Sequence, residues 1–300
     1  MKLATIQVDG TPRVVRVTPD GTAYWPLSDL LRGLPEQADM TAAITLLSSG
    51  TEAAEPRGAG TPLNHASLLA PLPAPPHNIL CVGKNYFAHA REFAGSGYDS
   101  SSTSAADAIP QAPIIFTKPS SAISGPADDI PLVPGLDAEV DYEAELAVII
   151  GKPGRGIAPE RAMEHVFGYT VVNDVTARDL QGKHKQWFLG KGIDGFCPMG
   201  PWIVTADELD ARAMRVTCHV NGEKRQDAST ADLIFDIPTL ISTISLSMTL
   251  RPGDVIATGT PEGVGIGFKP PRFLREGDVV ECAISGIGSI RNTLRRVALG

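Results

Sequence analysis

Residues 140–150 constrain the fold more than any other stretch of this 300-residue chain, and they read Val-Asp-Tyr-Glu-Ala-Glu-Leu-Ala-Val-Ile-Ile. Side chains on a β-strand alternate between its two faces. One face of a strand here is apolar along its length, whereas the other face carries Glu143 and Glu145 and then becomes apolar at Ala147 and Ile149. A strand that starts at the rim of a pocket and continues into a core accounts for both faces. We therefore predict a pocket beside a buried strand.

Glu143 and Glu145 are candidate metal ligands. Their side chains leave the strand on the same face, about 7 Å apart at two strand steps. Two carboxylates in this arrangement can converge on a hard divalent cation. The spacing alone is equally compatible with alternating charge on a solvated strand.

The glycine and proline content indicates how the rest of the chain folds. Thirty glycines and 25 prolines favour short strands and turns over long helices. We predict a β-rich α+β fold, with a small mixed N-terminal domain over residues 1–72 and a catalytic domain over residues 73–300. In the first domain, we expect strands at residues 2–8 and 13–18 around the turn Asp9-Gly10, and helices at 26–34 and 40–47.

The net charge, the hydrophobic pattern and the cysteine spacing exclude several kinds of partner and location. The net charge is −8 and no Lys/Arg block occurs, so we do not expect a nucleic-acid partner. No apolar run approaches the roughly 18 residues of a membrane span, and the N-terminus lacks the apolar core of a signal peptide. The four cysteines form no CxxC pair, which indicates buried thiols in a reducing, cytoplasmic compartment.

His89 and Glu92 are candidates for acid–base chemistry. They are three residues apart and would be neighbours on a helical turn. A carboxylate beside a histidine raises the basicity of the imidazole, so the pair could serve as a general base for water. An incidental pair on a surface helix is the alternative. The Ser/Gly/Ala-rich residues 94–111 follow directly and could be either a lid or a mobile insertion.

Further candidates follow a second apolar strand at residues 166–172. Asp174 lies where that strand ends, a place where carboxylates often line pockets. Arg178 and Gln181 are spaced to share a helix face, and an arginine fork suits a substrate carboxylate. Lys191 lies between glycines and could supply a point cation. An ordinary turn and ordinary surface charges are the alternatives for these residues.

Six motifs in order make this chain resemble the fumarylacetoacetate hydrolase superfamily over residues 78–297. The first 70 residues resemble the small N-terminal domain of many bacterial members. The motifs are Cys-Val-Gly-Lys-Asn-Tyr at 81–86 with His89 and Glu92, Phe-Thr-Lys-Pro at 116–119, Asp-Tyr-Glu-Ala-Glu-Leu at 141–146, Asn-Asp-Val-Thr-Ala-Arg-Asp at 173–179, Gly-Lys at 190–191, and Thr-Gly-Thr-Pro-Glu-Gly-Val-Gly at 258–265.

The resemblance implies a mixed β-sandwich roll, a homodimer and a Mg²⁺ or Mn²⁺ site. Larger eukaryotic members carry another acidic ligand before the catalytic dyad, where this chain has Gly-Lys-Asn at 83–85, so a three-carboxylate site is expected. By resemblance, the metal ligands are Glu143, Glu145 and Asp174, the catalytic residues are His89, Glu92 and Lys191, and the substrate contacts are Arg178, Gln181 and Thr260, with Lys118 added from its motif alone.

The resemblance also implies chemistry on a small oxo acid. We expect a metal-dependent hydrolase that cleaves a C–C bond in acylpyruvate-type 1,3-dicarbonyl 2-oxo acids, as in aromatic catabolism. The same enolate would allow decarboxylation of oxaloacetate. The alternatives are an isomerase or hydratase of unsaturated 2-oxo diacids, a ureidoglycolate-type lyase, and a non-catalytic member that binds a small acid.

Overall fold

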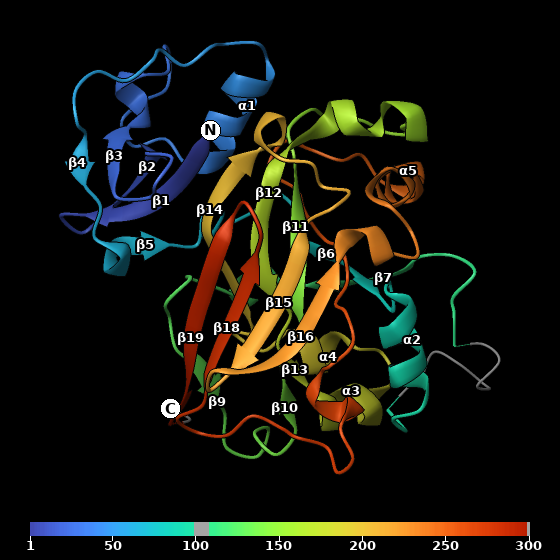
Figure 1. The fold of residues 1–300 in the computed structure, drawn as a ribbon. Helices are drawn as coiled ribbons and strands as arrows, with labels where there is room; N and C mark the ends of the chain where they lie inside the picture. The colour runs from blue at the N-terminus through green and yellow to red at the C-terminus, as the bar shows by residue number, and fades with distance from the viewer. Residues whose placement is uncertain (99–107, 299–300) are drawn as a thin grey trace.

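The computed structural model describes residues 1–98 and 108–298, and strands dominate them (Figure 1). Within these residues the largest sheet has 12 strands, in the order β4-β3-β2-β1-β14-β12-β11-β17-β6-β7, with β5 beside β1 and β8 beside β14. Its strands are β1 (Lys2–Val8), β2 (Thr11–Val17), β3 (Ala23–Pro26), β4 (Thr61–Pro62), β5 (Leu68–Leu69), β6 (Ile79–Gly83), β7 (Ile114–Lys118), β8 (Ile123–Ser124), β11 (Ala144–Ile150), β12 (Val166–Asn173), β14 (Cys197–Thr205) and β17 (Val255–Ala257).

A five-stranded sheet packs on one face of the large sheet and completes a sandwich. Its order is β16-β15-β18-β19-β9. The main core lies between the sheets and joins Leu146 and Val148 on β11 to Val216, Cys218 and Val280. These strands are β9 (Ile130–Leu132), β15 (Arg215–Val220), β16 (Glu223–Ser229), β18 (Val279–Ile284) and β19 (Gly288–Arg296), and a separate pair consists of β10 (Val140–Asp141) and β13 (Thr176–Ala177).

Short helices surround this sandwich, and the predicted α+β, strand-rich class is confirmed. Figure 1 shows α3 and α4 beside β10 and β13 at one end of the sheets, and α2 lies on the same side. No helix in residues 1–98 or 108–298 meets the length and hydrophobicity needed to span a membrane. The α-helices are α1 (Met40–Ser48), α2 (Phe87–Ala94), α3 (Arg178–His184), α4 (Phe188–Lys191) and α5 (Ile237–Ser247).

The predicted N-terminal hairpin is confirmed, and one predicted helix is wrong. Asp9 and Gly10 turn the chain with φ of 48° and 77°, and β1 also pairs with β14 of the large sheet. Residues 26–34 form only a short 3₁₀ turn at Leu27–Asp29. Gly33 and Pro35 interrupt any helix there. The second predicted helix, at 40–47, is confirmed as α1.

The predicted strand at residues 140–150 is interrupted at Tyr142 and Glu143, because the chain changes its pairing partner there. β10 pairs with β13, whereas β11 pairs with β12 and β17. At the break, Asn173 Oδ1 accepts the Glu143 N–H at 3.0 Å. The prediction of two different faces is confirmed, since Leu146 and Val148 belong to the main core and Ala147 and Ile149 to a second buried cluster.

The prediction of buried, unpaired thiols is also confirmed, whereas the reducing compartment stays a prediction. All four thiols, of Cys81, Cys197, Cys218 and Cys282, are free and buried. Cys218 and Cys282 face each other across β15 and β18 with their Sγ atoms 3.9 Å apart.

Candidate active site

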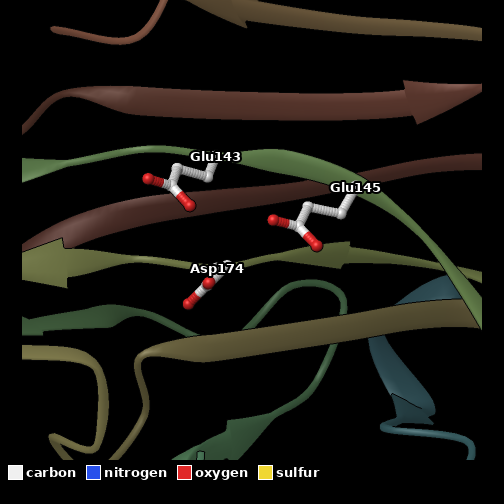
Figure 2. Close-up of side chains that lie close together, drawn as sticks. All are labelled: Glu143, Glu145 and Asp174. Carbon is white, nitrogen blue, oxygen red and sulfur yellow. The ribbon is translucent and has the colours of Figure 1, made fainter. Parts of the chain in front are cut away.

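Glu143, Glu145 and Asp174 form a buried acidic cluster at the end of the large sheet. Each residue offers a carboxylate oxygen, and these oxygens lie within 4.8 Å of one another. Figure 2 shows the three side chains converging from neighbouring strands. Antiparallel pairing of β11 with β12 produces this proximity, and the Asp174 N–H donates to the Glu143 carbonyl at 2.8 Å.

Two buried lysines contact the acidic cluster. Lys191 Nζ lies 2.7 Å from Glu143 Oε2 and 2.8 Å from Asp174 Oδ2. Lys118 Nζ lies 2.7 Å from Asp174 Oδ1 and also donates to the Val175 carbonyl at 3.0 Å. Burial alone would lower the pKa of Lys191, but Asp174 and Glu143 raise that pKa above its usual range, so the ammonium stays charged. Two of the three carboxylates, Glu143 and Asp174, are therefore paired with buried lysines.

Glu145 is the carboxylate of the acidic cluster that pairs with neither lysine. Its Oε2 accepts the Gly259 N–H at 2.8 Å, while both lysines pair with the other two carboxylates. Burial raises the pKa of Glu145 well above its usual range, and the nearby charges of Asp174 and Glu143 raise it further. A cation among the three carboxylates would relieve this electrostatic cost.

The donor set fits a hard divalent cation. All three groups are carboxylates, which suit Mg²⁺ and Mn²⁺ better than zinc. They are buried, and their oxygens converge. Together with Asp141 they place four carboxylates against three buried cations, those of Lys118, Lys191 and Arg178. Glu143, Glu145 and Asp174 are therefore the residues that would hold the ion.

Arg178 is held against the acidic cluster at the start of α3. Its Nε donates to Asp141 Oδ2 at 2.9 Å, and its Nη2 lies 2.6 Å from Glu143 Oε1. Its Nη1 donates to Gln181 Oε1 at 3.0 Å, so the predicted helix-face pair is present. Burial would lower the pKa of Arg178, but Glu143 and Asp141 outweigh burial and raise it.

Asp141 is a buried residue of this cluster that the sequence analysis missed. It pairs with Arg178 and accepts the backbone N–H groups of Gly265 and Ile266 at 2.6 and 3.2 Å. The signal was available, because strand alternation places Asp141 on the same face as Glu143.

His89 and Glu92 lie together on α2, as their spacing predicted. His89 Nδ1 is 3.2 Å from Glu92 Oε2, and the imidazole is buried. Glu92 also accepts the Gly263 N–H at 3.0 Å, which joins α2 to the glycine-rich loop at residues 258–265. A side chain on Gly267 would place its Cβ 1.8 Å from Glu92 Oε1, so it would force the Glu92 side chain to move.

Many of these side chains line one small pocket, but Glu92 and Asp141 do not. Its volume is about 20 Å³, which is enough for one water molecule, so binding an organic acid requires its walls to rearrange. Asp174 and Lys118 do not line the pocket themselves. Asp174 pairs with Lys191, which does line it, and Lys118 pairs with Asp174. The predicted site residues that line the pocket are His89, Glu143, Glu145, Arg178, Gln181, Lys191 and Thr260.

A larger cavity of about 780 Å³, lined by Tyr169, Leu209 and Ile237 among others, contains none of the predicted site residues. The predicted lid at 94–111 falls largely on residues 99–107, which lie outside the described residues.

Comparisons with known proteins agree on one family. The family model "Fumarylacetoacetate (FAA) hydrolase C-terminal" matches residues 78–295. The oxaloacetate tautomerase YisK of Bacillus subtilis (strain 168) is 48% identical over 233 residues, which are 77% of this chain and 74% of YisK.

Two solved structures extend the likeness to the whole chain. The 5-carboxymethyl-2-hydroxymuconate delta-isomerase of Mycobacterium smegmatis is 36% identical with a TM-score of 0.75, and the match covers 99% of this chain and 100% of that chain. The maleylpyruvate hydrolase of Sphingobium sp. SYK-6, in complex with manganese (II) ion and pyruvate, is 32% identical with a TM-score of 0.77 and the same coverage. The matched regions include every predicted site residue.

Proposed function

This chain belongs to the fumarylacetoacetate hydrolase superfamily of enzymes, and from that membership we propose that it is a Mg²⁺- or Mn²⁺-dependent enzyme that interconverts the keto and enol forms of a 2-oxo diacid such as oxaloacetate. The observation that carries the proposal is the buried cluster of Glu143, Glu145 and Asp174 beside His89 and Lys191. The 48% identity to an oxaloacetate tautomerase favours tautomerisation as the first candidate reaction.

The cation, when bound, would orient two substrate oxygens and stabilise negative charge on the C2 oxygen. His89, aligned by Glu92, would accept the C3 proton of the keto form. A proton delivered to the C2 oxygen then completes the enol, so the number of protons is unchanged. Lys191, charged and buried, stabilises negative charge that develops beside the carboxylates.

C–C hydrolysis is the second candidate, and the His89–Glu92 pair favours it because that pair can also activate water. Water would give a proton to His89, and the hydroxide would add to the distal carbonyl of an acylpyruvate. The C–C bond then breaks to give a pyruvate enolate, which takes up a proton, and a carboxylic acid. Decarboxylation of oxaloacetate would release CO₂ through the same enolate without water.

A metal-dependent activity screen tests the proposal. Oxaloacetate enol loss, followed by ultraviolet absorbance, and product release from acetylpyruvate and fumarylpyruvate are measured with Mg²⁺, Mn²⁺ or EDTA. We expect metal-dependent tautomerisation of oxaloacetate that Glu143→Gln abolishes. Pyruvate and a matching acid from an acylpyruvate would instead favour the hydrolase. Equal rates with EDTA and with metal would contradict both schemes, and inactivity on all substrates would favour the isomerase, lyase or non-catalytic alternatives.

The proposal includes a homodimer in the cytoplasm. Both parts are expectations from family membership. Light scattering during gel filtration tests the first, and a mass equal to that of one chain, 31.7 kDa, would contradict it.

A further inference from the structure

We infer that Gln226 is a positioning residue for the acidic cluster, an inference that rests on the proposed metal-dependent function. Gln226 lies on β16 in the five-stranded sheet, and it is 1% exposed. None of the predicted site residues belongs to that sheet. Its side chain nevertheless reaches the strand that carries Glu145.

A single buried amide joins this strand to the glycine-rich loop. Gln226 Oε1 accepts the N–H of Ala144, the residue between the two glutamates, at 3.0 Å. Its Nε2 donates to Thr260 Oγ1 and to the Pro261 carbonyl, both at 2.8 Å. Thr260 Oγ1 in turn donates to the Ala144 carbonyl at 3.1 Å, which closes a ring of hydrogen bonds.

The loop held by this ring contacts two parts of the candidate site. Gly259 N–H donates to Glu145, and Gly263 N–H donates to Glu92, the partner of His89. A shift of the loop would therefore displace a metal-binding carboxylate and the acid–base pair together. Gln226 can control both because it fixes the loop between these two glycines.

The backbone around Gln226 is shaped for this contact. The pairing of β16 with β15 slips between Cys218 and His219, so that Arg225 bulges out of the ladder next to Gln226. Such bulges re-aim neighbouring side chains. Gly263 packs so closely on this bulge that a Cβ there would lie 2.0 Å from the Arg225 carbonyl oxygen.

Glutamine is the side chain that these partners require. The Ala144 N–H can only donate and the Pro261 carbonyl can only accept, which fixes the orientation of the amide. A methionine of similar length would leave both groups buried and unpaired. A glutamate would lose both donors and add negative charge near Glu143 and Glu145.

The test compares Gln226→Met with a matched change, Asn292→Leu. Asn292 is also a buried amide of the five-stranded sheet, and its Nδ2 donates to the Gly125 and Asp128 carbonyls, away from the acidic cluster. Calorimetry of metal-free protein with Mn²⁺, together with thermal unfolding, is the measurement. Changes behind metal ligands typically cost 10–100-fold in metal affinity. We expect Gln226→Met to weaken Mn²⁺ binding about tenfold or more, and Asn292→Leu to lower the unfolding temperature without changing that affinity.

The outcomes separate this inference from the proposed function. Wild-type protein that binds no Mn²⁺ would remove the proposed function and this inference with it. If Gln226→Met binds Mn²⁺ as tightly as the wild type, the inference is overturned. It is also overturned if Asn292→Leu loses as much Mn²⁺ affinity as Gln226→Met. Neither result would contradict the proposed function. Gln226→Asn keeps an amide that is too short to reach both sides, so it serves if the methionine variant does not fold. An intermediate loss of Mn²⁺ affinity in Gln226→Asn supports the inference, and wild-type affinity overturns it.

Discussion

Glu143 and Glu145 are two residues apart, yet their surroundings shift their pKa values in opposite directions. Burial would raise the pKa of Glu143, but Lys191 and Arg178 outweigh burial and lower that pKa below its usual range. Burial raises the pKa of Glu145, and neighbouring carboxylates add to the rise. Glu143 thus balances the charge of Lys191 and Arg178. Glu145 pairs with neither, so its carboxylate, once ionised, can bind a cation.

This difference predicts opposite effects of two similar substitutions on the metal-free protein. Glu145→Gln removes like-charge repulsion and should raise the unfolding temperature by about 2–4 °C, equivalent to roughly 1 kcal/mol. Glu143→Gln leaves Lys191 and Arg178 less well paired and should lower the unfolding temperature. Both should abolish Mn²⁺ binding in calorimetry.

The pH dependence of the first effect follows from the raised pKa of Glu145. Such a carboxyl stabilises the fold below its unfolded pKa and loses that contribution as pH rises through the folded pKa. The gain from Glu145→Gln should therefore be largest above the folded pKa, shrink as pH falls toward the unfolded pKa, and vanish below the unfolded pKa. A gain of equal size at acidic and neutral pH would contradict this assignment.

The same raised pKa predicts that Mn²⁺ binding releases a proton. Below the folded pKa of Glu145 the carboxyl holds a proton that the cation must displace, so the affinity should fall by about tenfold per pH unit. Calorimetry in two buffers of different ionisation enthalpy measures the protons released. Affinity that does not change with pH, with no proton released, would count against Glu145 as a ligand.

At the scale of elements, one hydrogen-bonded contact couples helix α2 to the loop at 258–265. Glu92 on α2 accepts the Gly263 N–H and also aligns His89. The 3₁₀ turn at Gly265–Gly267 packs against the same helix. The acid–base pair thus depends on the loop that also contacts Glu145.

Gly267→Ala tests this coupling. The added Cβ would lie 1.8 Å from Glu92 Oε1, so Glu92 must move away from His89. We expect kcat to fall by about a hundredfold, at the low end of the range for loss of general acid–base catalysis, with little change in Mn²⁺ affinity.

Gly182→Ala on α3 is the matched control for Gly267→Ala. Among the residues that the structure describes, a Cβ at position 182 would meet only Tyr98 Cδ1, at 3.9 Å, so activity should be unchanged. Full activity in Gly267→Ala would show that turnover does not need Glu92 in this position.

At the scale of the molecule, the first strands share a core with the strands that carry the site. One buried cluster contains Leu3 on β1, Met40 and Ile44 on α1, and Ile149 and Val255 of the central strands. β1 also pairs with β14, with Lys2 opposite Val204. The division of the chain at residue 72 stays a prediction, and this shared core indicates that the two parts stabilise each other.

Ile44→Ala should therefore destabilise the whole chain. A large-to-small change at a fully buried position typically costs about 2–5 kcal/mol. We expect calorimetry to detect a single unfolding transition at a lower temperature, in which the candidate site unfolds together with the N-terminal residues. Two transitions, of which only one moves, would instead establish an N-terminal domain that folds independently.

The amino-acid pattern by itself determined the strand-rich class and most strands, and it indicated several of the candidate site residues. Alternation predicted the two faces of residues 140–150, and residue spacing predicted the pairing of His89 with Glu92. These features are local, because strand and helix geometry place such residues together whatever the rest of the chain does. The family motifs assigned Asp174, which is distant in the chain, to the same metal site as Glu143 and Glu145, and the pairing of β11 with β12 brings it to Glu143.

Only the tertiary structure decided which groups balance the charge and which groups hold the site in place. The break at Tyr142 and Glu143 arises because β10 and β11 pair with different strands, and Asp141 becomes a partner of Arg178 only after that folding. Gln226 reaches Ala144 across 82 residues of sequence, between two sheets. Periodicity describes the face of one element at a time, so it does not predict contacts that depend on how separate elements pack.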